Sequence, residues 1–202
     1  NAFLAAEDRN FYDHFGISPK SIARAALANI RGGKIREGAS TITQQLVRAY
    51  FLESDRTWTR KIREAMLAVM VETKLSKDQI LELYLNKIFF GNRSYGIESA
   101  CRNYFRKSVA EINVGEAALL AGLPKAPSYY APHRFPSRAS KRQKTVLRQM
   151  ADHGTITDEE RNKWTKIAVH IEGRAESFNH KAPYFLEAVR KEIKNQFEHK
   201  KI

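Results

Sequence analysis

Apolar residues recur every three or four positions along most of the chain, which is the spacing of amphipathic helices. The clearest stripe is Ile80, Leu83, Tyr84 and Ile88, which follows a capping box formed by Ser76 and Gln79. Two-residue alternation is confined to 166–171. The pattern therefore predicts an almost entirely helical domain, with helices expected at 17–35, 40–51, 56–69, 76–88, 95–105, 114–122 and 137–153, and a further one opened by Thr157 and Glu160.

Two of these helices carry the most unusual polar residues. Ser40 is expected to cap the first, which leaves N–H groups at its start for an anion such as phosphate. The second carries Trp58, Ile62, Met66 and Val69 at helical spacing beside a run of cations. We expect this apolar stripe to face the core and the cations to face away from it, although charge runs often mark only a solvated face.

Length and charge bound the possible functions. A chain of 202 residues is long enough for one domain, with room for two lobes. Its 35 Lys and Arg against 22 Asp and Glu give a net charge of +13, which favours an anionic partner: nucleic acid, a membrane surface or a phosphorylated substrate. The single cysteine, Cys101, cannot form an internal disulfide and is expected in the core.

Membrane contact is suggested by one segment. No apolar run reaches the ~20 residues that a spanning helix needs, and the sequence opens inside an expected helix, so we expect an anchor upstream of residue 1. Residues 17–35 interleave apolar positions with Lys20, Arg24, Arg31 and Lys34, a composition suited to a lipid headgroup layer. An ordinary surface helix is the alternative.

Longer motifs resemble a known family. EDRNFYDHFG (7–16), GASTITQQL (38–46), the segment 60–100 and GEAALLAGLPKAPSYYAP (115–132) resemble, in order, the five signatures of the family 51 peptidoglycan glycosyltransferases. KAPYFLEAVRKEI (181–193) resembles the start of the linker toward the transpeptidase domain of bifunctional class A penicillin-binding proteins. The resemblance implies an all-α, lysozyme-like, two-lobed domain over 1–180, with a membrane-facing jaw at roughly 17–37, and a linker over 181–202.

The same resemblance implies a reaction. Glu7 matches the catalytic base, which takes the proton of the 4-hydroxyl of lipid II so that this oxygen attacks C1 of the muramoyl sugar on the lipid-linked glycan chain. Undecaprenyl pyrophosphate departs with inversion. The residues themselves agree, because the aromatic side chains that follow Glu7, beginning with Phe11, could partly desolvate its carboxylate and raise its pKa.

Further positions match the family's substrate site. Arg48, Arg56 and Lys61 match cations that hold the pyrophosphate, and the predicted binding set is completed by Ser40, Gln44, Gln45, Asp8 and Phe11. Arg48 stands where the family usually has Lys. Glu64 matches a second catalytic carboxylate, which would orient Lys61 or bring Mg²⁺ or Mn²⁺ to the pyrophosphate; a simple salt bridge is the alternative. No obligatory cofactor or metal site is expected, since the six histidines are scattered.

The implied partners are lipid II, the lipid-linked glycan, the inhibitor moenomycin and the outer face of the bacterial cytoplasmic membrane. A lysozyme-like hydrolase or lytic transglycosylase is the nearest alternative, but cleavage of neutral glycosidic bonds does not need the three cations. A nucleic-acid-binding domain would use the basic stretch Lys141 to Arg148. It leaves Glu7 and Asp8 unexplained, so no nucleic-acid partner is expected.

Overall fold

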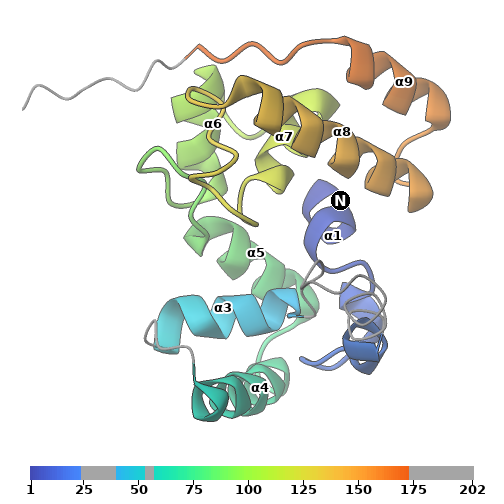
Figure 1. The fold of residues 1–202 in the computed structure, drawn as a ribbon. Coiled ribbons are helices and arrows are strands. Elements are labelled where there is room, and N and C mark those ends of the chain that lie inside the picture. Colours follow the sequence, from blue (N-terminus) through green and yellow to red (C-terminus); the bar gives the residue numbers. More distant parts are fainter. Residues whose placement is uncertain (24–39, 53–56, 173–202) are drawn as a thin grey trace, which may run out of the picture.

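The computed structural model describes residues 1–23, 40–52 and 57–172, and within them it is built from helices and loops (Figure 1). The described part of the chain contains no strand, only two isolated bridges. The helical segments are α1 (Ala2–Glu7), η1 (Phe11–Asp13), α3 (Ile42–Phe51), α4 (Trp58–Glu72), α5 (Lys77–Lys87), α6 (Ile97–Phe105), α7 (Val114–Gly122), α8 (Pro136–Asp152) and α9 (Asp158–Lys166). The all-α prediction is confirmed.

Local capping signals start these helices where the sequence indicates. Ser76 with Gln79, Asn113 with Glu116 and Thr157 with Glu160 each form a capping box in which side chains satisfy N–H groups that the first turn leaves unpaired. Pro136 occupies the first position of α8, where a missing N–H costs nothing.

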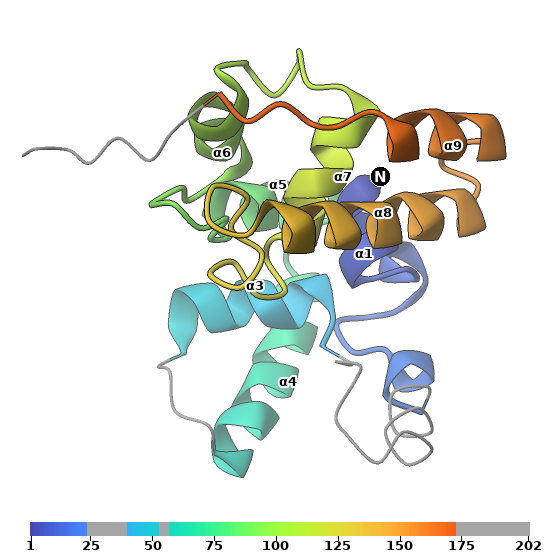
Figure 2. The ribbon, with the colours of Figure 1, turned by 45° about the horizontal axis from the view of Figure 1, so that its top comes forward.

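The helices form two groups. Helices α7 and α8 pack on each other, on α1 and on α9, whereas α3 packs on α4 and α5. Helix α5 also contacts α6, and buried residues of both belong to one hydrophobic cluster with α1, α7 and α8, which joins the groups (Figures 1 and 2). The expected two-lobed shape is therefore present in the described residues.

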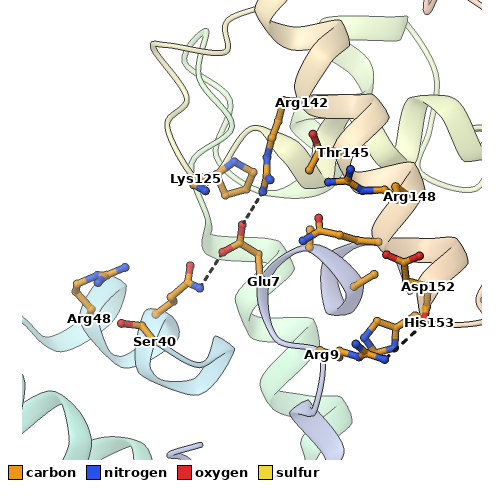
Figure 3. A pocket seen from close by; sticks show the side chains of 15 residues that line it. Glu7, Arg9, Ser40, Arg48, Lys125, Arg142, Thr145, Arg148, Asp152 and His153 are labelled. Atoms are coloured by element: carbon orange, nitrogen blue, oxygen red, sulfur yellow. Dashed lines mark hydrogen bonds and ion pairs between the residues drawn. The ribbon is translucent and has the colours of Figure 1, made fainter. Parts of the chain in front are cut away.

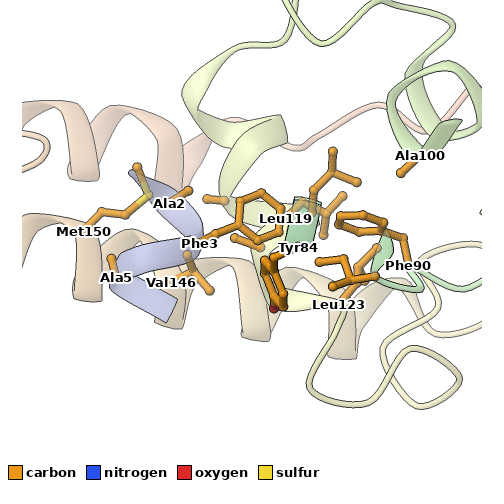
Figure 4. Packing of buried hydrophobic residues seen from close by; sticks show 14 of the residues in the cluster. Ala2, Phe3, Ala5, Tyr84, Phe90, Ala100, Leu119, Leu123, Val146 and Met150 are labelled. Carbon is orange, nitrogen blue, oxygen red and sulfur yellow. The ribbon is translucent and has the colours of Figure 1, made fainter. Parts of the chain in front are cut away.

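A hydrophobic core extends from α1 across α7 and α8 to α5 and α6. Phe3 meets Phe90 edge to face, with ring centroids 5.8 Å apart, and Tyr84 and Leu119 lie beside them (Figure 4). Cys101 is fully buried in this cluster, as expected. Because Ala2, Phe3 and Ala5 anchor one side of the short helix α1, its last residue, Glu7, has a fixed position between the two helix groups.

Helix α4 differs from the expectation. Of the predicted stripe, Trp58, Ile62 and Met66 are 87%, 60% and 62% exposed and Val69 is half-buried; Met70 beside it is 60% exposed. The buried residues of the helix are Glu64, Ala68 and Glu72. The predicted orientation of this helix was wrong, because the buried carboxylates find cationic partners inside the fold whereas the larger stripe finds no neighbouring element in the described structure.

The expected jaw and linker lie largely outside the described residues. Within 17–37 only the first seven residues are described, and Ile22 among them is 48% exposed. The predicted linker at 181–202 and Arg56 also lie outside. Among the described helices, none combines the length and apolarity that crossing a membrane would require.

Candidate active site

A cavity of about 650 Å³ lies between the two helix groups, and Glu7 stands in its wall (Figure 3). Gln45 Nε2 donates a hydrogen bond to Glu7 Oε2 over 3.1 Å, and a guanidinium nitrogen of Arg142 lies 3.9 Å from Glu7 Oε1. The carboxylate therefore has one neutral donor and one cation, each on its own oxygen.

Gln45 and Arg142 are each positioned by a further hydrogen bond. Gln45 Oε1 accepts a hydrogen bond of 3.4 Å from the hydroxyl of Tyr84, which is fully buried on α5. Arg142 donates from Nε to the carbonyl oxygen of Gly122 over 3.3 Å. A Cβ atom at Gly122 would come within 2.8 Å of Arg142 Cγ, so glycine is what leaves room for this arginine to reach Glu7.

The electrostatics of Glu7 suit a base. Burial raises the pKa of its carboxyl group, and the hydrogen bond from Gln45 followed by Arg142, Lys125 and Arg48 opposes that rise. The balance leaves the pKa above its ordinary value, so the ionised carboxylate binds a proton more readily than an exposed glutamate does.

Glu64 has a different environment. It is fully buried, and its oxygens contact Arg60 Nη1 at 2.8 Å, Arg48 Nη1 at 3.9 Å and Lys61 Nζ in a short hydrogen bond. Lys61 Nζ also donates to Ser40 Oγ over 2.9 Å. Glu64 thus fixes the position of Lys61, which extends to the Ser40 segment.

A divalent cation fits poorly beside Glu64. Both carboxylate oxygens already face cationic side chains, which would repel a second positive charge. In the described ranges no group of three or more His, Cys, Asp or Glu residues is placed to hold a metal ion. The contact with Lys61 is the one that an orienting role requires, and this role of Glu64, like the alternative of a simple salt bridge, stays a prediction.

The start of α3 is assembled differently from the prediction. Thr41, not Ser40, is the N-cap, and Gln44 completes the capping box by accepting from the Thr41 N–H over 3.0 Å. Asp8 accepts from the Ile42 N–H over 2.9 Å. A side-chain carboxylate, and not a bound phosphate, therefore occupies the anion position at this helix start.

The predicted site residues fall into two sets. The structure brings Glu7, Ser40, Gln45 and Arg48 together in the cavity wall, with Lys61 and Glu64 behind Ser40. Asp8, Phe11 and Gln44 are 4%, 1% and 4% exposed and support the site from inside the fold. Asp8 is held there by His14 as well, at 3.0 Å.

Several wall residues were not predicted. Lys125 lies within the motif GEAALLAGLPKAPSYYAP, which by itself indicates no role for it, and Arg142 lies within the basic stretch Lys141 to Arg148. A signal for Arg142 exists, because it shares the buried face of α8 with Ala139 and Val146 at spacings of three and four. The wall continues through Arg9, Thr145, Arg148, Gln149, Asp152 and His153, which no motif indicated as a group.

Comparisons with known proteins identify the family of the chain. A family model described as Transglycosylase matches residues 1–151. Penicillin-binding protein 1A of Neisseria flavescens is 46% identical over 193 residues, which cover 96% of this chain and 24% of that protein. Penicillin-binding protein 1A of Aquifex aeolicus is also 46% identical, over 98% of this chain and 27% of its own length.

Among solved structures, a crystal structure of penicillin-binding protein 1A from Haemophilus influenzae is similar, with 33% identity and a TM-score of 0.48. The match covers 77% of this chain and 20% of that one. The chain thus spans about a quarter of the length of the curated relatives above.

Proposed function

We propose that this chain, which belongs to the transglycosylase family, is a peptidoglycan glycosyltransferase that polymerises lipid II. The observation that carries this proposal is Glu7, a carboxylate with a raised pKa in a cavity wall where the charged groups that act on it, Arg142, Lys125 and Arg48, are cations. Inversion at C1 requires one base for the attacking hydroxyl and fixed positive charge for the leaving group. The wall supplies both.

In the proposed reaction Glu7 removes the proton of the 4-hydroxyl of lipid II while that oxygen forms a bond to C1 of the muramoyl sugar on the lipid-linked glycan. The bond from C1 to the pyrophosphate oxygen breaks, and its electron pair leaves with undecaprenyl pyrophosphate. Arg48 and Lys61 stand on the Ser40 side of Glu7, where they would stabilise that developing charge. Gln45 and Arg142 would stabilise the ionised form of Glu7 before the proton arrives.

The hydrolase alternative receives less support. Hydrolysis by two carboxylates requires both to flank the scissile bond, whereas Glu64 is fully buried and paired with cations. Glu7 and Glu64 therefore do not face one another across the cavity.

A membrane surface is part of the proposal. Lipid II is membrane-bound through its undecaprenyl chain, and the exposed stripe Trp58, Ile62, Met66 and Met70, which we call the α4 stripe, offers an apolar face on a chain of net charge +13. We place the enzyme at the outer face of the bacterial cytoplasmic membrane.

Incubation with lipid II tests the function directly. We expect the wild-type chain to form glycan polymer, moenomycin to block it, and Glu7→Gln to lower the rate roughly 10²–10⁴-fold because the base is lost while shape is kept. Glu82→Gln, an exposed carboxylate of α5, is the control and should polymerise normally. Wild-type polymer formation by Glu7→Gln would refute the assignment, and release of short fragments from preformed glycan would indicate a hydrolase.

A further inference from the structure

The cavity continues past Glu7 to an end that the proposed reaction does not use. Arg142, Thr145, Gln149 and Asp152 follow one face of α8, and beyond Glu7 this face meets Arg9 at the start of the loop after α1 (Figure 3). This end, formed by Arg9, Arg148, Gln149, Asp152 and His153, lies on the side of Glu7 away from Ser40 and Arg48. We call it the α8 end.

Two guanidinium groups at the α8 end are available to a ligand. Arg9 donates a long hydrogen bond of 3.5 Å to the backbone carbonyl oxygen of Asp152. Across the described ranges, neither Arg9 nor Arg148 forms an ion pair with a carboxylate. Arginine recognises carboxylate and phosphate through paired N–H donors, so an anion is the ligand that these side chains fit.

Two buried polar atoms beside them lack partners within the described structure: Gln149 Oε1 and His153 Nε2. A buried acceptor without a donor costs free energy, and native structures usually satisfy it with water or a ligand. Burial, and then the nearby Arg9, lower the pKa of His153, so its ring is neutral at neutral pH. Together with the Asp152 carboxylate, the α8 end needs N–H donors as well as an anion.

We infer that the α8 end binds the peptide carried by the muramoyl sugar of the substrate, an inference that rests on the proposed function. The peptide's carboxylates meet Arg9 and Arg148, and its amide N–H groups donate to Gln149. Phosphate shares the anionic chemistry but supplies no N–H donor for Gln149. A peptide satisfies both requirements.

Direct binding tests this inference without turnover. Calorimetry of the wild-type chain should show binding of soluble N-acetylmuramoyl pentapeptide and about 10-fold weaker binding of the same peptide with amidated carboxylates. Arg148→Gln and Arg9→Gln should each weaken the acidic peptide about 10-fold and leave the amidated one unchanged. Lys144→Gln removes the same charge from another face of α8 and should change neither.

Kinetics provide the second measurement. In Arg148→Gln we expect KM for lipid II to rise about 10-fold with kcat unchanged, and KM for lipid II with an amidated peptide to stay at the wild-type value. An equal loss on both substrates would overturn the inference. The inference would also be overturned if inorganic pyrophosphate displaced the bound peptide as effectively as a second acidic peptide does, because the α8 end would then be a phosphate site.

The two proposals fail separately. If the wild-type chain binds the muramoyl peptide in an Arg148-dependent way but forms no polymer, the polymerase function is refuted and the peptide subsite stands. If it forms polymer but binds both peptides equally, the subsite is refuted alone.

Discussion

At the scale of single residues, the environment of Glu7 makes its carboxylate more basic and makes the folded chain less stable when that carboxylate is ionised. Its carboxylate sits at the end of a core helix where water is largely excluded, and one amide plus three cations only partly offset that exclusion. A group arranged in this way is useful as a base because its ionised form is held at a cost.

This cost predicts a pH-dependent stability difference. Because the pKa of Glu7 in the folded chain lies above its unfolded value, the folded chain binds the proton more tightly and stability falls as pH rises through the interval between the two pKa values. Glu7→Gln removes the charge, so it should melt at a higher temperature than wild type at neutral pH. The difference should vanish below the ordinary pKa of 4.5.

Thermal denaturation followed by circular dichroism measures this. Glu82→Gln, exposed to solvent, should show no such difference. A melting difference for Glu7→Gln that stays constant from acid to neutral pH would show that ionisation of Glu7 is not its cause.

Glu64 has the opposite character, since its charge is matched on every side. Glu64→Gln removes the buried anion that Lys61 and Arg60 contact and should lower the free energy of unfolding by roughly 2–3 kcal/mol, less than for a wholly buried pair because both cations reach solvent. Turnover should fall but stay measurable, because Lys61 loses its orientation and not its charge.

Urea unfolding and lipid II turnover check this together. Asp158→Asn, which breaks an exposed pair with Arg161, should cost less than about 1 kcal/mol. Unchanged stability in Glu64→Gln combined with complete loss of turnover would make Glu64 a reacting group instead.

At the scale of elements, the start of α3 shows what short-range patterns miss. Hydroxyl and amide residues at 40–45 predict a helix start and an anion beside it, and both exist. The anion is Asp8, which lies 34 positions away from Ile42 in the sequence, so no local signal could identify it.

The Asp8 contact predicts a structural phenotype. Asp8→Ala leaves the buried Ile42 N–H and His14 without their acceptor and should destabilise the chain by about 1–3 kcal/mol. Asp13→Ala, an exposed carboxylate of the same motif, should have little effect on the urea midpoint. If Asp8→Ala lowers turnover while its unfolding curve matches wild type, Asp8 acts on substrate as the sequence suggested.

Helix α4 provides the second example. Spacing predicts that Trp58, Ile62 and Met66 share one face, but it does not determine whether that face packs against protein or remains exposed. The cationic partners of the buried Glu64 and Glu72, which lie elsewhere in the fold as well as on α4, determine which face turns inward.

The exposed stripe predicts lipid binding. The triple variant Trp58→Gln, Ile62→Gln and Met66→Gln should bind anionic vesicles roughly 10²-fold more weakly, because each apolar side chain contributes when it leaves water. Vesicle co-sedimentation measures this, with Val109→Gln combined with Tyr129→Gln, two exposed loop positions away from α4, as the control. Equal binding by both variants would remove α4 from the lipid contact.

At the scale of the whole molecule, the sequence predicts the helices, the two groups and the family, because each rests on periodicity or on motifs of adjacent residues. It does not predict that α8 closes the cavity. Arg142 reaches Glu7 across 135 positions, and that approach depends on how α1, α7 and α8 pack on one another.

The two tryptophans of the chain divide between these helix groups. Trp58 on α4 is 87% exposed, and Trp164 on α9 is partly buried against the core beside Gly115. Their fluorescence should therefore differ: long-wavelength emission that iodide quenches readily from Trp58, and shorter-wavelength, protected emission from Trp164. A Trp164→Phe chain would report optically on α4 alone, so an emission shift on adding lipid would locate the contact without any added label.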